Sequence, residues 1–201
     1  MRVILVRHGE TALNAEGRFR GRADVPLTAR GLQQAGAVAQ SLVPLAPATV
    51  VSSPRLRARQ TAEPIARSMR AAVLVDDRLD DVDYGEWTGL TRAEVVSSWP
   101  AQYALWLEAP ERLRVPGGER VGGVRDRVWS ALCEIAGRGQ PAIVVTHDAC
   151  VRLAIVAFLG APTASMHVIR VDLASRTELE FGDDTTQLVC ANDTSHLREL
   201  Q

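Results

Sequence analysis

Short runs of uninterrupted apolar residues recur along the chain and predict the strands of a sheet. The runs are rich in β-branched residues, and continuous apolarity is typical of parallel strands that are buried on both faces. The predicted strands are 3–6, 49–51, 72–75, 143–145 and 168–171. After Thr177 the pattern changes: strands at 179–181 and 188–190, joined by a turn at 182–184, predict a hairpin at the edge of the sheet.

Between these runs, apolar residues recur at helical spacing. One predicted helix begins at Thr28, ends before Pro44, and carries an apolar stripe from Leu32 to Leu42. Further helices are predicted over about 55–69, 119–136 and 149–159. Strands that alternate with helices indicate βαβ units, so we expect an α/β fold: a three-layer sandwich with a mostly parallel sheet between helical layers.

Aromatic residues concentrate between Tyr84 and Trp106, a segment that holds both tyrosines and three of the four tryptophans. This segment is either a small helical subdomain with a core of its own or a lid with aromatic walls over a pocket, and the two descriptions are compatible. The sequence shows no repeat or linker. We therefore expect one domain over 1–201, with a helical lid insertion at about 84–116.

Composition limits the classes of protein to consider. The chain has 201 residues, 46% of them hydrophobic, and a formal net charge of −1. This length suits one domain with a substantial core, and the balanced charge gives no global reason to bind nucleic acid or an anionic membrane. Cys133, Cys150 and Cys190 lack CxxC spacing, which favours reduced thiols in a cytosolic protein. No apolar stretch resembles a secretory signal or a transmembrane segment, so we expect a cytoplasmic location.

Polar residues directly follow three of the predicted strands. Arg7 and His8 follow the first, Ser53 follows the second with Arg57 one helical turn later, and His147 follows the fourth. Ligands of open α/β sheets bind at the carboxyl ends of the strands, so we expect these side chains to share one crevice. Two guanidiniums and two imidazoles there favour a phosphoryl ligand, because arginine presents a planar fork of donors that fits phosphate oxygens.

The sequence lacks the motifs of several other ways of attacking phosphorus. It contains no GxxxxGK[ST] loop, HExxH, HxH or dense aspartate cluster for a metal, no GxSxG elbow and no CxxxxxR loop. Histidine remains as the candidate nucleophile, since a neutral imidazole can carry a phosphoryl group covalently near pH 7. We therefore expect chemistry without a metal or other cofactor.

Several motifs occur together in the order typical of one family. They are LVRHGET at 5–11, SSPRLRARQTA at 52–62, RLDDVDYGEWTG at 78–89, PGGE at 116–119 and VVTHDACVR at 144–152. The series resembles the histidine phosphatase superfamily, also called phosphoglycerate mutase-like, over nearly the whole chain. Glycolytic mutases of this family usually carry longer insertions, so the resemblance implies its small phosphatase branch.

The resemblance implies roles for individual residues. His8 would be the nucleophile that becomes phosphohistidine. The phosphoryl oxygens would be held by Arg7, Asn14, Arg57 and His147. Arg20 and Gly21 lie in the loop that touches the substrate in this family.

The proton donor has several candidates. The family commonly has a glutamate four residues before the glycine of its GxWxG stretch, and here that position is Asp81, one methylene shorter. Asp148 is an alternative, because one branch of the family has a proton donor directly after the second histidine; Asp83 and Glu86 also stay open. The acid would protonate the leaving oxygen and then activate water, and burial or a nearby carboxylate should raise its pKa.

We therefore expect a metal-independent phosphatase that hydrolyses small phosphate monoesters through a covalent phosphohistidine on His8. The alternatives are a phosphoglycerate mutase and a non-catalytic binder of phosphorylated ligands. The expected partner is a small phosphorylated metabolite, with no nucleic acid and no membrane; a homodimer stays open.

Overall fold

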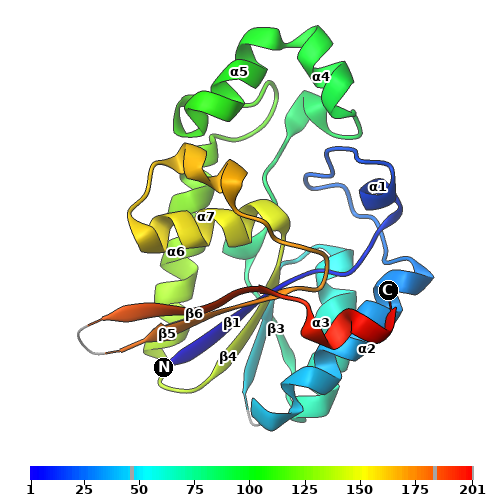
Figure 1. Cartoon of the computed structure of the whole chain (residues 1–201), viewed down its shortest axis with the longest axis vertical. Helices are drawn as coiled ribbons and strands as arrows, with labels where there is room; N and C mark the ends of the chain where they lie inside the picture. Colours follow the sequence, from blue (N-terminus) through cyan, green and yellow to red (C-terminus); the bar gives the residue numbers. More distant parts are fainter. Residues whose placement is uncertain (46–47, 183–184, 201) are drawn as a thin grey trace.

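A six-stranded sheet forms the centre of the molecule (Figure 1). The structure is a computed structural model that describes residues 1–45, 48–182 and 185–200. Its strands are β1 (Arg2–Arg7), β2 (Thr49–Ser52), β3 (Val73–Val75), β4 (Ala142–Thr146), β5 (Arg176–Phe181) and β6 (Thr186–Asp193). Its α-helices are α1 (Ala12–Ala15), α2 (Ala29–Leu42), α3 (Leu56–Met69), α4 (Arg92–Ser98), α5 (Pro100–Glu108), α6 (Val121–Gly137) and α7 (Asp148–Leu159). Short 3-10 helices are η1 (Val43–Leu45), η2 (Asp77–Leu79), η3 (Gly85–Trp87), η4 (Pro110–Arg112), η5 (Thr163–Val168) and η6 (Ser195–Leu200).

The strand order is β3-β2-β4-β1-β5-β6. The first four strands in this order are parallel, whereas β5 runs antiparallel to β1 and β6 antiparallel to β5. The predicted α/β fold with a mostly parallel sheet is therefore confirmed, and so are the two strands of the predicted hairpin. Positions 183–184 of its predicted turn lie outside the described residues.

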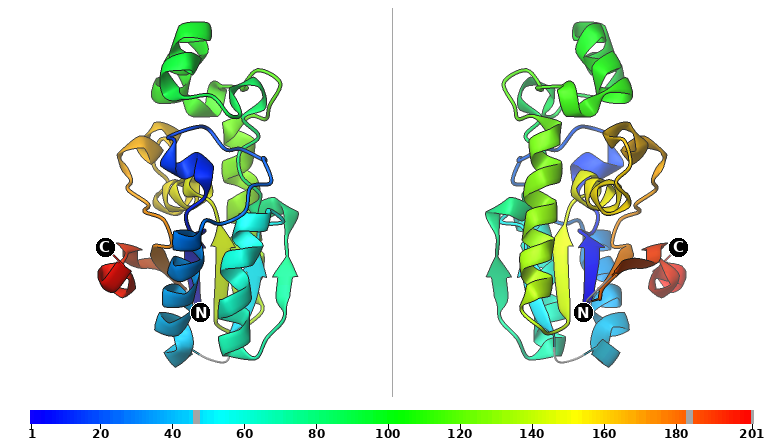
Figure 2. Two further views of the ribbon diagram at one scale, coloured as in Figure 1. Left: turned by 90° about the vertical axis from the view of Figure 1, so that its right-hand side faces the viewer. Right: turned by 90° about the vertical axis from the view of Figure 1, so that its left-hand side faces the viewer.

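Helices cover both faces of the sheet. Figure 2 shows α2 and α3 in front of the sheet in one view, and α6 and α7 in front of it in the opposite view. Strand β1 serves both layers: Ile4 and Val6 pack with α2 and α3, while Val3 and Leu5 pack with α6 and α7. Both sets are buried because successive side chains of a strand point to opposite faces.

The ends of the helices follow from local chemistry. The Thr28 hydroxyl accepts a hydrogen bond from the Gly31 amide at 3.1 Å and so caps the first turn of α2. At the C-terminal end of α7, Gly160 adopts the left-handed conformation that glycine reaches without strain. The apolar stripe predicted for α2 is wrong at its first member, because Leu32 is 53% exposed.

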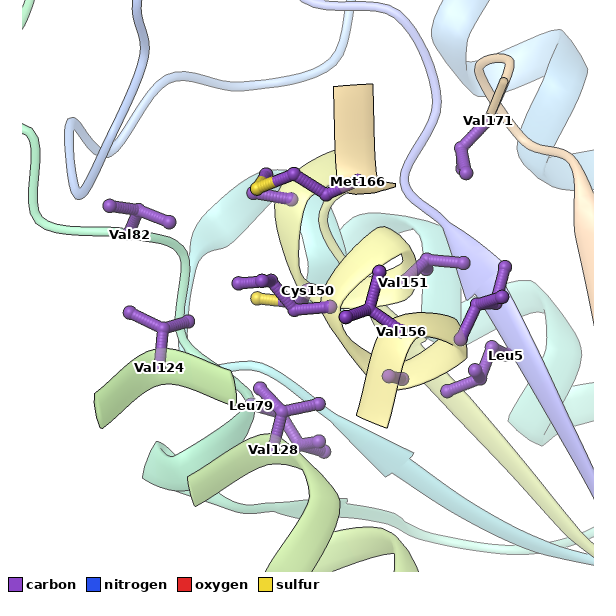
Figure 3. Close-up of a cluster of buried hydrophobic side chains, with 14 of the residues drawn as sticks. Leu5, Leu79, Val82, Val124, Val128, Cys150, Val151, Val156, Met166 and Val171 are labelled. Atoms are coloured by element: carbon purple, nitrogen blue, oxygen red, sulfur yellow. The ribbon is translucent and has the colours of Figure 1, made fainter. Parts of the chain in front are cut away.

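The predicted strand at 168–171 is wrong. This segment follows η5 and pairs with no strand of the described sheet, and Val168 is 86% exposed. The edge of β1 that it would need is occupied by β5. Val171 is nevertheless buried and belongs to the same cluster as Met166 and Val151, so its side chain contributes to the core and not to a strand ladder (Figure 3).

The segment between Tyr84 and Pro116 is helical, as predicted, and α4 and α5 lie at the end of the molecule opposite the N-terminus (Figure 1). Its aromatic rings pack edge-on: the centroids of Trp87 and Trp106 are 6.3 Å apart, and Tyr84 lies 5.0 Å from Phe19, which comes from outside the segment. These residues belong to the same buried cluster as α6 and α7. The expectation of a separate core for this segment is therefore wrong.

Candidate active site

The carboxyl ends of β1, β2 and β4 bring three polar segments together, as parallel strands of one sheet must. The His8 amide donates to the Thr146 carbonyl at 3.0 Å, and the Ser53 amide donates to the Val145 carbonyl at 2.9 Å. His8, Ser53 and His147 are fully buried. The polar groups that the sequence predicted to come together thus lie at one edge of the sheet.

The surroundings of His8 favour a neutral imidazole with its lone pair on Nε2. Its Nδ1 lies 2.7 Å from the Gly9 carbonyl oxygen, which only accepts, so Nδ1 carries the proton. Its Nε2 then holds the lone pair and accepts a hydrogen bond from Arg57 Nε at 3.2 Å. Burial, assisted by the positive charge of Arg57, holds the pKa of His8 well below its ordinary value. The ring therefore stays neutral at pH 7.

Arg57 connects the nucleophile candidate to two loops. Its guanidinium is fully buried and donates to the carbonyls of Gly21 and Ala23, each at 2.7 Å, and to Asp81 Oδ2 at 3.0 Å. Gly21 has φ +50°, and a Cβ there would lie 3.2 Å from the backbone of the loop that carries Asp81. A glycine at this position thus allows the two loops to approach.

His147 lies against His8, with ring centroids 5.3 Å apart in an edge-on arrangement. Its Nε2 is 2.7 Å from Ser53 Oγ. Its Nδ1 is 3.6 Å from Asp81 Oδ2 and, among the described residues, has no hydrogen-bond partner although it is buried. Burial and the nearby Arg57 also hold the pKa of His147 well below its ordinary value. A buried nitrogen without a partner is suited to bind an oxygen of a ligand.

The two acid candidates sit in different surroundings. Asp81 is buried, and burial raises the pKa of its carboxyl against the opposing effect of Arg57. Asp148 lies at the start of α7 with 25% of its side chain exposed, paired with Arg152 at 2.8 Å and 3.7 Å from Arg7. Asp81 is thus the candidate that lies beside both Arg57 and His147.

Residues 3–194 match the sequence profile of the histidine phosphatase superfamily, branch 1. The chain belongs to this superfamily. Phosphoserine phosphatase 1 of Hydrogenobacter thermophilus is 32% identical over 202 residues, covering all of this chain and 96% of the relative. A Salmonella paratyphi C protein named probable phosphoglycerate mutase is 32% identical over 209 residues, covering 98% of this chain and 95% of the relative.

A solved structure leads to the same family. A variant of phosphoserine phosphatase from Entamoeba histolytica, in complex with phosphoserine, has a TM-score of 0.89 at 26% identity, and each chain covers 98% of the other. The expected family, fold and enzyme class are confirmed: the chain is a phosphoric monoester hydrolase.

The other arginines predicted for the phosphatase site surround the two histidines. Arg7 Nη1 donates to the Val171 carbonyl at 2.5 Å, and burial lowers its pKa to about 10. The positive charge of Arg20 contributes to lowering the pKa of His8 and of His147. The Nε atoms of Arg7 and Arg20 are buried without a partner among the described residues. These groups supply positive charge and free donors to the crevice.

Asn14 has a local role in this structure. Its Oδ1 accepts from the Thr11 amide at 3.1 Å and from the Thr11 hydroxyl at 2.7 Å, which caps α1. Within the described residues, no hydrogen bond joins Asn14 to His8, Arg57 or His147. Its predicted part in phosphoryl binding stays a prediction.

Asp83 and Glu86 lie in contacts of their own. Asp83 Oδ1 accepts from the Gly85 amide at 3.0 Å, and the Glu86 amide donates to the Pro116 carbonyl at 2.9 Å. In the described parts of the chain, neither side chain bonds to a site histidine. The Asp83 side chain thus binds the loop backbone at Gly85, and the Glu86 backbone joins this loop to the PGGE motif.

Two hydroxyls lie near the histidines: Ser53 was expected at this edge of the sheet, whereas Thr61 had no predicted role. Thr61 Oγ1 accepts from the Gly9 amide at 3.1 Å and donates to the Arg57 carbonyl at 2.8 Å, which joins the loop after β1 to α3. Ser53 Oγ is the partner of His147. Thr61 lies four residues after Arg57 on the same helix, so helical spacing was the available signal.

Across residues 1–45, 48–182 and 185–200, no group of three or more histidine, cysteine, aspartate or glutamate side chains could hold a metal ion. Over the same ranges, no helix has both the length and the apolar character needed to cross a bilayer.

Proposed function

We propose that this phosphatase hydrolyses small phosphate monoesters in two steps, through a covalent phosphohistidine at His8 Nε2. The observation that carries the proposal is the lone pair of a buried, neutral imidazole that accepts a hydrogen bond from a buried guanidinium. A nucleophile in this state needs no base to remove a proton before it attacks. The phosphoryl oxygens would displace the Arg57 contact and bind that guanidinium themselves.

In the first step, Nε2 attacks phosphorus and the ester P–O bond breaks. The leaving oxygen takes the proton of Asp81, so an alcohol departs and Asp81 becomes a carboxylate. In the second step, this carboxylate removes a proton from water, the water oxygen attacks phosphorus, and the N–P bond breaks. Phosphate leaves, and His8 and Asp81 return to their starting states.

The donors around the crevice are suited to the charge on the phosphoryl oxygens. Arg7, Arg57, Arg20 and the free Nδ1 of His147 would bind these oxygens, and a single preorganised donor supplies about 3–4 kcal/mol of transition-state stabilisation. Several guanidiniums supply positive charge of the kind that a divalent cation provides elsewhere, so we propose that the reaction is independent of metal.

We assign the proton to Asp81 and not to Asp148. Burial favours the protonated form of Asp81, and its Oδ2 lies 3.6 Å from His147 Nδ1, at the side of the site where a phosphoryl oxygen would bind. Asp148 is held by Arg152 at 2.8 Å, and its proposed part is to orient Arg7 and Arg152.

The substrates to test first follow from the names of the relatives. Two of them are phosphoserine phosphatases, so phosphoserine is a candidate substrate for this chain. One is named a phosphoglycerate mutase, so transfer between 2- and 3-phosphoglycerate is the second candidate activity. Phosphoserine and the two phosphoglycerates are small phosphate monoesters of alcohols that also carry a carboxylate.

The decisive experiment assays a panel of phosphate esters in the presence of EDTA, with rapid-quench labelling of the protein. We expect wild type to release phosphate and to form an acid-labile adduct at His8, and His8→Ala to do neither. Asp81→Asn should lose turnover of alkyl esters, and Asp148→Asn should keep more of it. Turnover by His8→Ala, or activity that disappears with EDTA and returns with a divalent cation, would contradict the proposal.

A further inference from the structure

Arg127 lies on α6, outside the set of site residues, and directs its guanidinium at the loop that carries Asp81. Its Nη1 donates to the carbonyls of Arg78 and Asp80, each at 2.6 Å. Its Nη2 donates to the Asp81 carbonyl at 3.1 Å and to Glu119 Oε1 at 2.9 Å. One mostly buried side chain thus binds three backbone carbonyls at or near the acid.

This loop has no strand partner of its own, so side chains satisfy its backbone. The fourth carbonyl, that of Leu79, accepts from the Thr146 hydroxyl at 2.7 Å. The Asp80 carbonyl also accepts from Cys150 Sγ at 3.2 Å. All four carbonyls from 78 to 81 therefore have side-chain donors, and Arg127 supplies three of these contacts. The backbone of this loop is therefore held by side-chain hydrogen bonds, mostly from Arg127, and not by pairing with a strand.

Glu119 extends the same contact. Its Oε1 accepts from Arg127 and also from the Asp83 amide at 2.8 Å, two residues after the acid. The two residues together hold the backbone on both sides of Asp81. Neither has a hydrogen bond with His8 or His147 among the described residues. The charge of Arg127 does contribute to lowering the pKa of His147, so a variant that keeps this charge isolates the effect of the loop contacts.

We propose that Arg127, held by Glu119, is a positioning residue that sets the reach of the Asp81 carboxyl toward the leaving oxygen. The proposal rests on the role proposed above for Asp81. A proton donor works only within hydrogen-bond distance of the atom it protonates. The aspartate side chain is short, so a shift of the Asp81 backbone moves the carboxyl with little rotamer freedom to compensate.

The test compares esters whose leaving groups need a proton with esters whose leaving groups do not. Arg127→Lys keeps the charge, but a single ammonium cannot span three carbonyls and a carboxylate. We expect kcat/KM for an alkyl phosphate to fall about 10- to 100-fold, since small misplacement of a catalytic group has effects of that order. For a dinitrophenyl phosphate, whose dinitrophenolate leaving group departs without a proton, kcat/KM should change far less.

Glu119→Gln is a milder second variant and should show the same selectivity with a smaller loss. Arg138→Ala is the matched control: it removes an exposed arginine at the end of α6 that pairs with Glu134 at 3.1 Å. This variant should leave kcat/KM for both esters unchanged. Far-UV circular dichroism and thermal unfolding would verify that each variant folds.

Asp81→Asn, assayed in parallel, separates the two proposals. Suppose that Asp81→Asn lowers kcat/KM for the alkyl ester much more than for the dinitrophenyl ester, whereas Arg127→Lys and Glu119→Gln lower kcat/KM for the two esters equally or not at all. The positioning role is then wrong and the acid assignment stands. If Asp81→Asn itself shows no selectivity, the acid assignment is wrong and the positioning role is wrong with it. Labelling of His8 in wild type tests the phosphohistidine separately, because it does not depend on the leaving group.

Discussion

Burial controls the charge of the residues at the site. His8, Arg57 and His147 are fully buried, and Asp81 is nearly so. Desolvation disfavours a charged imidazole and a charged carboxylate, which keeps both histidines neutral and raises the pKa of Asp81. The states required of the proposed nucleophile and the proposed proton donor both result from one physical cause, and the buried guanidinium between them has the charge that the proposed phosphoryl ligand needs.

This arrangement predicts how the stability of the folded state depends on pH. The pKa of His8 and that of His147 lie well below 6.5 in the folded protein and return toward 6.5 on unfolding. Below pH 6.5 the unfolded chain therefore binds more protons than the folded one, and the free energy of unfolding falls as the pH falls. Each histidine contributes a slope of up to about 1.4 kcal/mol per pH unit in this window, and above it the contribution is fully present.

Urea unfolding at several pH values between 5 and 7 tests this prediction. We expect His8→Gln to lose stability more slowly than wild type as the pH falls, by about 1.4 kcal/mol per pH unit. Asp81 has the opposite sign, since its raised pKa removes stability as the pH rises through it, but it is present in both proteins and cancels in the comparison. Equal slopes in the two proteins would show that His8 titrates normally when folded.

At the scale of elements, the close approach of α2 to the loop after β1 positions His8. A Cβ on Gly31 would collide with the Glu10 carbonyl, and one on Gly9 would lie 2.6 Å from the Gly31 carbonyl. Two glycines therefore allow the helix to pack directly against the backbone next to His8. The Thr28 hydroxyl reinforces this contact by donating to Glu10 Oε1 at 2.8 Å.

Two glycine substitutions in α2 should have opposite effects. Gly31→Ala should lower the free energy of unfolding by about 1–3 kcal/mol, as overpacking does, and should reduce kcat/KM because Glu10 and Gly9 must shift. Gly36→Ala has open space around its Cβ and should raise the free energy of unfolding by about 0.5–1 kcal/mol with activity unchanged. Urea unfolding and ester hydrolysis measure both. Similar stability of the two variants would contradict the close approach.

The pattern of elements was largely predictable, and its errors have physical causes. Continuous apolar runs identify β1, β2 and β4 because these strands are buried on both faces. The run of β3 also forms a strand, although β3 lies at the edge of the sheet and Leu74 and Val75 are exposed. The run at 168–171 contains Arg170, and the edge of β1 that it would need is occupied by β5. Leu32 shares the helical spacing of its neighbours, yet exposure depends on what lies opposite the helix, which spacing does not encode.

At the scale of the whole molecule, one buried cluster runs from the sheet through α6 and α7 to the aromatic segment. Val3 in β1 and Trp106 in α5 belong to the same cluster, although they lie at opposite ends of the structure. The helices of the aromatic segment therefore share their packing with the sheet. A segment that shares its core should unfold together with the rest.

Chemical unfolding should therefore be a single transition. Three of the four tryptophans lie between Tyr84 and Trp106, so fluorescence reports on this segment, whereas far-UV circular dichroism reports on all helices. We expect the two signals to give the same midpoint. An earlier midpoint in fluorescence would show that the aromatic segment unfolds as a separate unit.

The sequence by itself determined the family, the α/β fold and the residues His8, Arg57 and His147, because apolar periodicity and ordered motifs are local properties of the chain. The tertiary structure decided which of the acids lies against the histidines, that Thr61 joins the site, and that Asn14 caps α1. It also brought Arg127 to the Asp81 loop from 46 positions away. Such contacts join segments that are distant in sequence, and their distances and burial arise only when the chain packs.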